Sequence, residues 1–533
     1  MNKDNYLFFE NGFLNSKYFY YIIPAAYFVI MLFVSMINRE IGDYGVETDF
    51  YVAYVHQAKE LLNGNFIVDQ YRGPVYQLFL AVTGFLFRYD YFSAGKFLNV
   101  MSASITLYFT SKIVGSIFNR EGAFITVLLV AVNQIFLKYS YTAGTDMLFL
   151  AFYTSSLYFI LKNDELNFKN LLVAGVLSGL AYLTRYTGIS LIVFVVLVFL
   201  MHFYKKFNIT HSFKKSFPAK SLTYYLIPVL ILSSIWGIIS YQKTGYFINN
   251  MNFQNTALTV YKPENMSNDE WIHKHQNTFN SMRDVVFKEL GTFAKKIFLN
   301  NFPLYFAKDM SRLLPKYLGI LAVFGLIVFI IKLKSQNLLE KYFLLASLIF
   351  YFQILLIFYS ERFSLPLLPF YCFLIVKLFS YDFLQRFNFN ISKLRFYGII
   401  LFLLIIFNLT NSIIAVKTDI NSGPKEILSV KDWSEKNYYK ELSGKLIMAR
   451  KPHIAYYLDM KLSVTPYLEN YNDFVQNIKN RNIDYVYVSE REAEYLTNQN
   501  LKQVLLNYNV PPEELEVITK TMNPIAILYK VKK

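Results

Sequence analysis

Residues 396–416 read FYGIILFLLIIFNLTNSIIAV, an apolar run without a charged side chain. A helix of ~20 such residues crosses the hydrocarbon core of a bilayer. Ten further segments are sufficiently apolar to be predicted as spans, and two of them are short. They are Tyr18–Ile37, Leu98–Phe118, Gly122–Tyr139, Met147–Leu161, Leu171–Leu183, Thr187–Tyr204, Leu222–Ser240, Tyr317–Ile331, Tyr342–Tyr359 and Phe363–Ser380. The sequence therefore predicts an all-α, multi-pass membrane protein with about eleven transmembrane helices.

The composition agrees with this class. Of 533 residues, 54% are hydrophobic and 19% are aromatic, whereas soluble domains are ~45–50% apolar. The single cysteine, Cys372, excludes an intramolecular disulfide and any cysteine-rich metal site, and its apolar surroundings predict an inert, packed thiol. The first span has no small-residue cleavage site after it, so we expect an anchor rather than a removed signal.

The basic residues indicate the topology. Five predicted loops (111–121, 162–170, 205–220, 332–341 and 381–395) carry fifteen Lys and Arg, and three short opposite loops (140–146, 184–186 and 360–362) carry two. Positive charge gathers in cytoplasmic loops. We therefore expect a protein of the cell membrane whose N-terminus lies on the cytoplasmic side. The net charge of +16 is then explained by the basic residues of the cytoplasmic loops. It therefore does not indicate a nucleic-acid partner.

Three long segments are expected outside the membrane: 38–99, 241–316 and the C-terminal residues. Within the first, Val75–Arg88 has a helical apolar stripe but only 14 residues, a length typical of an interfacial helix. Residues 417–533 alternate helix-like and strand-like segments, with strands expected at 446–449, 483–489 and 524–531. We therefore predict a membrane module over 1–416 and a small extracytoplasmic α/β domain over 417–533.

Two acidic residues stand out in the first outer segment. Asp49 opens an amphipathic stretch that ends at Asn63-Gly64, and Glu47 lies two residues earlier. A carboxylate at a helix start has a structural explanation, since it interacts favourably with the helix N-terminus. The functional alternative is a general base for a hydroxyl group.

Further polar residues cluster on the same predicted face. Arg72 follows Tyr71 before Gly73-Pro74, Arg185 and Arg362 stand at predicted helix junctions, and Asp146 precedes a span. Arginine binds phosphate through a fork of donors, although snorkelling toward lipid headgroups also explains a membrane-flanking arginine. Three arginines on the face with the fewest charges favour a functional site.

Other motifs give little support for different chemistry. His273 and His275 lie one residue apart without a third ligand at helical spacing, so we interpret them as solvated loop residues. The sequence contains no phosphate-binding glycine loop and no nucleophile elbow.

Four motifs together resemble the GT-C glycosyltransferases, specifically the bacterial, family 39-type relatives of protein O-mannosyltransferases and lipid A aminoarabinose transferases. The motifs share one predicted side of the membrane and span residues 20–380. They are Glu47-Thr48-Asp49 with its following helix, Tyr71-Arg72-Gly73-Pro74, Tyr139–Asp146 with Gly179–Arg185, and Glu361–Pro369. Members of this family also have interfacial helices in the first outer loop.

The resemblance implies an inverting transfer of a sugar from a polyprenyl-phosphate donor to an acceptor hydroxyl of a glycan, lipid or protein. It assigns Asp49 as the base, with Glu47 as the rival, and Asp146 as a cavity residue that orients acceptor or base. Arg72, Arg185 and Arg362, with Tyr71, are then candidates for the donor phosphate. Where the lipid A enzymes carry Glu-Lys before the proline, this chain has Arg72-Gly73, which argues against an aminoarabinose donor.

We expect no cofactor. A divalent metal held by Glu47, Asp49 and Asp146 is the alternative that the resemblance leaves open. Two other functions are alternatives: a transporter or flippase for lipid-linked glycans without this site, and a glycan polymerase whose active site lies in 241–316. The C-terminal domain is expected to influence the choice of acceptor.

Overall fold

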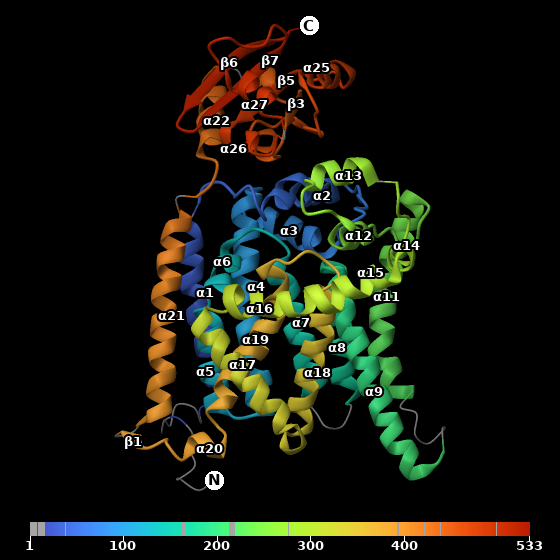
Figure 1. Ribbon diagram of the computed structural model, residues 1–533, viewed down its shortest axis with the longest axis vertical. Coiled ribbons are helices and arrows are strands. Elements are labelled where there is room, and N and C mark those ends of the chain that lie inside the picture. Colours follow the sequence, from blue (N-terminus) through green and yellow to red (C-terminus); the bar gives the residue numbers. More distant parts are fainter. Residues whose placement is uncertain are drawn as a thin grey trace. The chain divides into compact units, whose positions relative to one another are not determined.

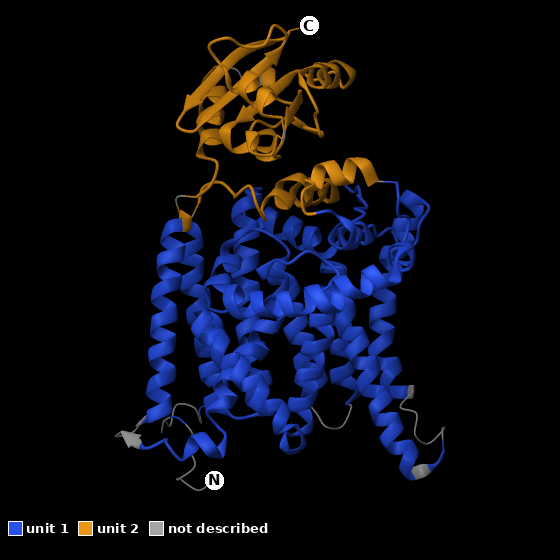
Figure 2. Ribbon diagram, in the orientation of Figure 1, with its two compact units in different colours: residues 1–37, 64–263, 277–418 blue, residues 38–63, 264–276, 419–533 orange. Residues whose placement is uncertain are grey.

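The chain folds into two compact units in the computed structural model (Figure 2). Unit 1 comprises residues 1–37, 64–263 and 277–418, and unit 2 comprises 38–63, 264–276 and 419–533. The structure describes all residues except 1–7, 9–15, 17, 38, 163–166, 213–218, 276, 392, 393, 421, 438, 497 and 533.

Unit 1 is helical and its long helices form a bundle (Figure 1). The longer helices are α1 (Phe19–Ile37), α3 (Val75–Leu86), α4 (Tyr91–Ile117), α5 (Arg120–Ala131), α6 (Gln134–Tyr141), α7 (Asp146–Leu161), α8 (Phe168–Thr184), α9 (Ile189–Thr210), α11 (Ala219–Thr244), α12 (Phe253–Tyr261), α17 (Lys316–Ile331), α18 (Leu338–Ile354), α19 (Leu368–Leu378) and α21 (Phe396–Ile420). Shorter elements connect them: η3 (Tyr186–Gly188), α14 (Met282–Lys288), α15 (Leu290–Ala294), η4 (Lys295–Asn301), α16 (Phe302–Lys308), η5 (Asp309–Leu313), η6 (Leu333–Ser335), η7 (Glu361–Leu367), α20 (Asp382–Gln385), β1 (Asn390–Ile391) and β2 (Leu394–Arg395).

Each predicted span coincides with helical structure, but the helices differ in length. Within the described ranges, five helices are long and apolar enough to cross a membrane, namely α1, α4, α9 with η3, α11 and α21. The bent pair α5 and α6 makes a sixth if it is counted as one span. The helices α7, α8, α17 and α18 have 16 or 17 residues and α19 has 11, fewer than the ~20 of a full crossing.

The predicted span at Gly122–Tyr139 is not one straight helix, because the chain bends by 64° between α5 and α6. Asn133 causes the break by starting a new helix: its side chain accepts the backbone N–H groups of Ile135 and Phe136, both at 3.0 Å. Its amide also donates to the carbonyl of Leu313 at 2.8 Å. An asparagine in this capping position satisfies the free N–H groups at a helix start.

Helix α3 has the character expected of an interfacial helix. It is 12 residues long, and its exposed face carries Leu78, Val82, Phe85 and Leu86, with Val82 65% exposed. Its buried face includes the polar Gln77 and Thr83. An exposed apolar face opposite a packed one is typical of a helix lying at a membrane surface.

Close packing in the bundle depends on small residues. A Cβ added to Gly175 of α8 would lie 2.2 Å from the carbonyl oxygen of Tyr225 in α11. The two helix backbones can therefore approach only because this position has no side chain, a pattern common between membrane helices.

Unit 2 contains a five-stranded mixed sheet in the order β4-β3-β5-β7-β6. Strands β3, β4 and β5 pair in parallel, whereas β7 pairs antiparallel with β5 and β6. The strands are β3 (Leu446–Ala449), β4 (Lys461–Val464), β5 (Tyr485–Ser489), β6 (Leu515–Met522) and β7 (Ile525–Val531). The helical elements are η2 (Phe50–Tyr54), α2 (Val55–Leu62), α13 (Asn268–His275), α22 (Lys425–Asn437), α23 (Tyr439–Leu442), α24 (His453–Tyr457), α25 (Tyr471–Asn480), α26 (Glu490–Ala493) and α27 (Gln499–Leu506).

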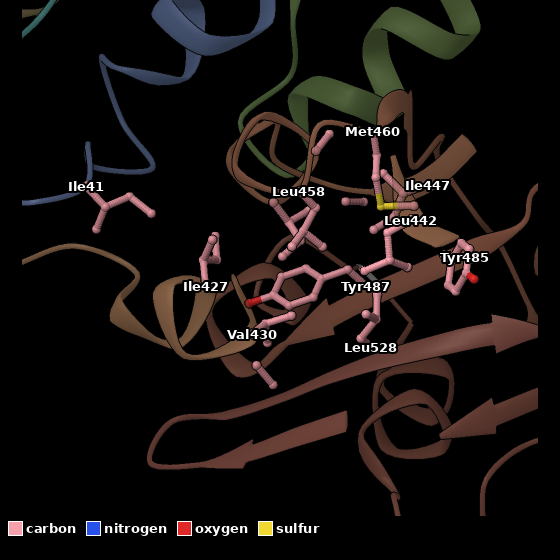
Figure 3. Packing of buried hydrophobic residues seen from close by; sticks show 14 residues of the cluster. Ile41, Ile427, Val430, Leu442, Ile447, Leu458, Met460, Tyr485, Tyr487 and Leu528 are labelled. Atoms are coloured by element: carbon pink, nitrogen blue, oxygen red, sulfur yellow. The ribbon is translucent and has the colours of Figure 1, made fainter. Parts of the chain in front are cut away.

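Unit 2 is not confined to the C-terminal residues. The predicted strands at 446–449, 483–489 and 524–531 are found, but 38–63 and 264–276 also belong to this unit. Ile41 is 2% exposed and joins the core formed by Ile427, Ile447 and Leu528 (Figure 3). The C-terminal part of unit 2 begins at Asp419, and two loop segments from the predicted membrane module also belong to this unit.

Candidate active site

Unit 1 brings together three of the predicted site residues. Asp146 is the first residue of α7, Arg185 follows the last residue of α8, and Arg362 lies in η7. One carboxylate oxygen of Asp146 accepts a hydrogen bond from Arg185, and the other lies 4.0 Å from Arg362. We call these three residues the arginine cluster.

The arginine cluster is rigidly packed and carries one net positive charge. Asp146 is 4% exposed, and each arginine side chain is 18% exposed. The guanidinium carbons of Arg185 and Arg362 lie 4.9 and 4.8 Å from the centre of the Phe363 ring. Guanidinium groups pack favourably on aromatic rings. The helix N-terminus at Asp146 further stabilises the carboxylate, so both arginines are held in fixed orientations.

The two carboxylate oxygens of Asp146 face the side chains of Arg185 and Arg362. The carboxylate therefore positions the guanidinium groups, and its predicted role in orienting acceptor or base stays a prediction. These contacts also remove Asp146 from any simple metal site, since a cation would have to displace two arginines.

Tyr71 and Arg72 lie in a loop that packs beside the end of α8. A Cβ on Gly73 would lie 2.0 Å from the carbonyl oxygen of Leu183, two residues before Arg185. Arg72 pairs with Asp69 at 2.9 Å, and the Tyr71 hydroxyl donates to Gln254 at 2.6 Å. The loop therefore lies next to the α8 end of the arginine cluster, but Arg72 has its own carboxylate partner.

Asp309 is a buried carboxylate that the sequence gave no reason to select. Its oxygens accept hydrogen bonds from Tyr359 and Tyr371, both at 3.0 Å. Burial raises the pKa of Asp309 to about 7. These tyrosines are 50 and 62 residues away in sequence, so no local motif marks the group. In the structure, Asp309 begins the π-helical turn η5, and such turns are frequent at functional sites.

In unit 2, Glu47 and Asp49 have different environments. Glu47 is 0% exposed, lies 2.9 Å from Arg39 and accepts the backbone N–H of Asp43 at 2.7 Å. Arg39, 2% exposed, also faces Asp419 at 3.6 Å. Glu47 is thus enclosed in a buried ion pair that holds the first loop segment to the start of the C-terminal chain, which is incompatible with its predicted role as the rival base.

Asp49 remains the accessible carboxylate of the pair. It is partly exposed and directly precedes the π-helical turn η2. Its side chain makes no capping hydrogen bond to η2. The aromatic residues that follow fix the segment: Tyr51 packs 4.5 Å from the His453 ring and its hydroxyl lies 3.2 Å from that of Tyr457.

Replacing Glu47 with Gln is expected to destabilise unit 2 without changing any reacting group. Removing one partner of a buried ion pair costs about 3–5 kcal/mol, and Asp43 and Asp419 near Arg39 place the loss at the lower end. Hydrogen exchange of residues 38–63 measures it. Glu435→Gln, which breaks the exposed pair with Lys431 at 3.5 Å, is the control and should leave exchange unchanged. Equal protection in Glu47→Gln and the wild type would contradict the structural role.

Two buried groups give unit 2 a defined pH dependence. Burial raises the pKa of Glu492 to about 8 from 4.5, and lowers the pKa of His453 to about 3 from 6.5. Folding therefore favours protonated Glu492 between pH 4.5 and 8 and opposes protonation of His453 below 6.5. The two effects oppose each other from 4.5 to 6.5, so Glu492 acts alone above 6.5.

We therefore expect the stability of unit 2 to fall as the pH rises from 6.5 to 8. One pH unit corresponds to about 1.4 kcal/mol, which gives a loss of about 2 kcal/mol over this range. Hydrogen exchange of β3 and β5, corrected for its intrinsic pH dependence, measures the change. Glu492→Gln should abolish the slope, and a slope that persists in this variant would assign it to another group.

A metal site does not form from the predicted ligands. Glu47 and Asp146 each already face an arginine side chain. Among the residues that the structure describes, no group of three or more His, Cys, Asp and Glu side chains is placed to hold a metal ion. The proposed ligand set therefore does not fit a metal, and the metal-free reaction stays a prediction.

Comparison with known proteins gives a match to one family over part of the chain and several solved structures with a similar fold. Residues 71–236 match the family described as dolichyl-phosphate-mannose-protein mannosyltransferase. No curated protein matches the chain. The match covers Tyr71, Arg72, Asp146 and Arg185, and thus two members of the arginine cluster.

Solved structures share the fold over nearly the whole chain. ArnT from Cupriavidus metallidurans, bound to undecaprenyl phosphate, has 10% identity and a TM-score of 0.55, over 96% of this chain and 98% of that one. The oligosaccharyltransferase AglB from Archaeoglobus fulgidus, with an inhibitory peptide and a dolichol-phosphate, has 13% identity and a TM-score of 0.53, over 92% and 72%. The chain therefore shares the fold of these membrane proteins, the GT-C fold.

Proposed function

We propose that this protein transfers a sugar from a polyprenyl-phosphate donor to an acceptor hydroxyl, with inversion at the sugar carbon. The observation that carries the proposal is the convergence of Arg185 and Arg362 on Asp146. The arginine cluster carries one net positive charge, and its two oriented guanidinium groups can bind a phosphate group through paired donors.

The positive charge of the arginine cluster would act in the transition state of the transfer. The acceptor oxygen forms a bond to the anomeric carbon while the bond from that carbon to the donor phosphate oxygen breaks, and the acceptor proton passes to a base. Negative charge grows on the departing phosphate oxygen, and pre-oriented donors stabilise that charge in the transition state. We propose Asp49 as the base, because its carboxylate is partly exposed and its position matches the acidic residue of the GT-C first loop.

The comparisons support a lipid-linked donor. The ArnT structure holds undecaprenyl phosphate, the AglB structure holds a dolichol-phosphate, and the matched family is described by a dolichyl-phosphate-mannose donor. We extend the polyprenyl-phosphate class to this chain. The acceptor is a hydroxyl group of a glycan, a lipid or a protein.

We further propose that the protein lies in the cell membrane with its N-terminus in the cytoplasm and its C-terminal domain outside. The bias of Lys and Arg toward one set of loops supports this orientation. We also propose that the reaction uses no metal, since Glu47 and Asp146, two of the three candidate ligands, already face arginine side chains.

The test is donor turnover by the purified full-length protein in detergent. A panel of polyprenyl-phosphate sugars is offered beside the matching nucleotide sugars, and release of polyprenyl phosphate is followed with and without EDTA. The proposal predicts release from a lipid-linked sugar, none from nucleotide sugars, and no effect of EDTA. Turnover of a nucleotide sugar instead would overturn the donor class.

A further inference from the structure

The chain between α18 and α19 carries Arg362 and includes η7. Residues 355–360 of this stretch are all described and form neither helix nor strand, so the hydrogen bonds of a regular element do not fix their path. Arg362 nevertheless has a defined position beside Asp146 and Phe363. Contacts from elsewhere in the chain must therefore hold the segment that presents it.

Three buried polar side chains supply such contacts, and they recur at every fourth residue. They are Asn301, Tyr305 and Asp309, which belong to the consecutive helical elements η4, α16 and η5. Residues four apart are neighbours on one face of a helix. We call these three residues the polar ridge.

Two members of the polar ridge hold the chain that leads into η7. The amide of Asn301 donates to the carbonyl of Leu355 at 2.9 Å, and the hydroxyl of Tyr305 donates to the carbonyl of Ile357 at 2.8 Å. Carbonyl groups at the end of a helix have no partner within that helix. The polar ridge therefore supplies partners where α18 ends and the irregular stretch begins.

The third member, Asp309, joins the two sides of η7. One carboxylate oxygen accepts the hydroxyl of Tyr359, which precedes η7, and the other accepts the hydroxyl of Tyr371 in α19, both at 3.0 Å. Asp309 is 0% exposed, so water does not compete for these bonds. The carboxylate thus fixes both ends of the stretch in which Arg362 lies.

We infer that Asp309 is a positioning residue of the donor site and acts through Arg362. It holds the two ends of η7 and thereby sets the direction in which the Arg362 guanidinium faces the donor phosphate. The inference rests on the proposed transferase function and adds a residue that does not touch the substrate. Catalysis depends on such orientation, because a displacement of ~1 Å caused by a distant change can lower a rate about 10²-fold.

The first test is single-turnover release of polyprenyl phosphate by the full-length protein in detergent, with the lipid-linked sugar that the wild type cleaves. We expect Asp309→Asn to lower release about tenfold, since asparagine has one acceptor oxygen for two tyrosine hydroxyls. Tyr359→Phe removes one of the two bonds and should lower release about threefold. Tyr225→Phe is the matched control and should stay within twofold, because its buried hydroxyl donates to Ser178 at 2.7 Å, away from η7.

A comparison of double variants separates positioning from a loss of folded protein. Acting through Arg362, Asp309→Asn should cost about twofold or less in an Arg362→Lys background but keep its loss of about tenfold in an Arg185→Lys background. A loss of folded protein would instead lower release by the same factor in both backgrounds. Equal factors, or wild-type release in Asp309→Asn, would overturn the positioning role and leave the proposed function standing.

Hydrogen exchange of residues 355–371 tests the anchoring without any donor. Exchange in this stretch should rise in Asp309→Asn and in Tyr359→Phe, and it should stay at the wild-type level in Tyr225→Phe. Unchanged exchange in the first two variants would overturn the inference. Raised exchange together with no donor release from the wild type would instead count against the proposed function.

Discussion

Arg185→Lys is expected to lower the release of polyprenyl phosphate by about 10²-fold, and Arg362→Lys by a similar factor. Removing one pre-oriented donor from a site of developing charge typically costs 10²–10³-fold in rate. Lysine keeps the charge but loses the planar fork and the packing of the guanidinium on Phe363, for which the distances are 4.9 and 4.8 Å. The measurement is single-turnover donor cleavage in detergent at saturating lipid-linked sugar.

The effect should depend on position rather than on arginine in general. Arg312 lies 3.7 Å from Glu361 and is 59% exposed, so Arg312→Lys is the matched control and should stay within twofold. The double variant Arg185→Lys/Arg362→Lys should lose less than the product of the single losses, because the two side chains share Asp146 and Phe363. Near-normal cleavage in both single variants would remove the arginine cluster from the donor site.

Asp49→Asn is expected to lower sugar transfer by about 10²–10⁴-fold, the range that a positioned general base contributes. Asparagine keeps the size of the side chain but cannot take up the acceptor proton. Because asparagine has nearly the same shape as aspartate, hydrogen exchange of residues 38–63 should stay close to that of the wild type. Transfer is measured with a fixed lipid-linked donor and the product is quantified by mass spectrometry.

A second acidic residue of the same segment serves as the control. Glu60 lies in α2, within 38–63, and Glu60→Gln should transfer normally. The contrast with Glu47→Gln is equally informative: that variant should lose protection from hydrogen exchange, whereas Asp49→Asn should lose transfer. Turnover within twofold of the wild type in Asp49→Asn would assign the base elsewhere.

Much of the secondary structure follows from local sequence. The apolar runs are long enough that their helices, including α1, α4 and α21, could be predicted directly, and the short stripe at Val75–Leu86 indicated the outward apolar face of α3. The apolar pattern did not predict the bend in the segment Gly122–Tyr139. Asn133 stands in an otherwise continuous run, and its capping bonds start a new helix there.

The candidate site was predictable only in part. Arg185, Arg362 and Asp146 were selected because lone charges near spans are costly and need a reason, and the structure brings them together. Asp309 was missed because its partners come from elements 50 and 62 residues away. The contact between Arg450 and Asp269 was missed for the same reason, since these two residues lie 181 positions apart in the sequence.

By itself, the sequence determined that this is a membrane protein and where most of its helices lie. It also predicted three strands of the C-terminal domain and the candidate site residues. These depend on hydrophobic periodicity and on the cost of placing charge near lipid, both of which are local properties. Only the tertiary structure decided that Glu47 is enclosed by Arg39 while Asp49 stays accessible, and that 38–63 and 264–276 belong to the C-terminal unit. Burial and ion pairing are made by side chains distant in sequence, so two carboxylates one residue apart acquire different roles only once the chain has folded.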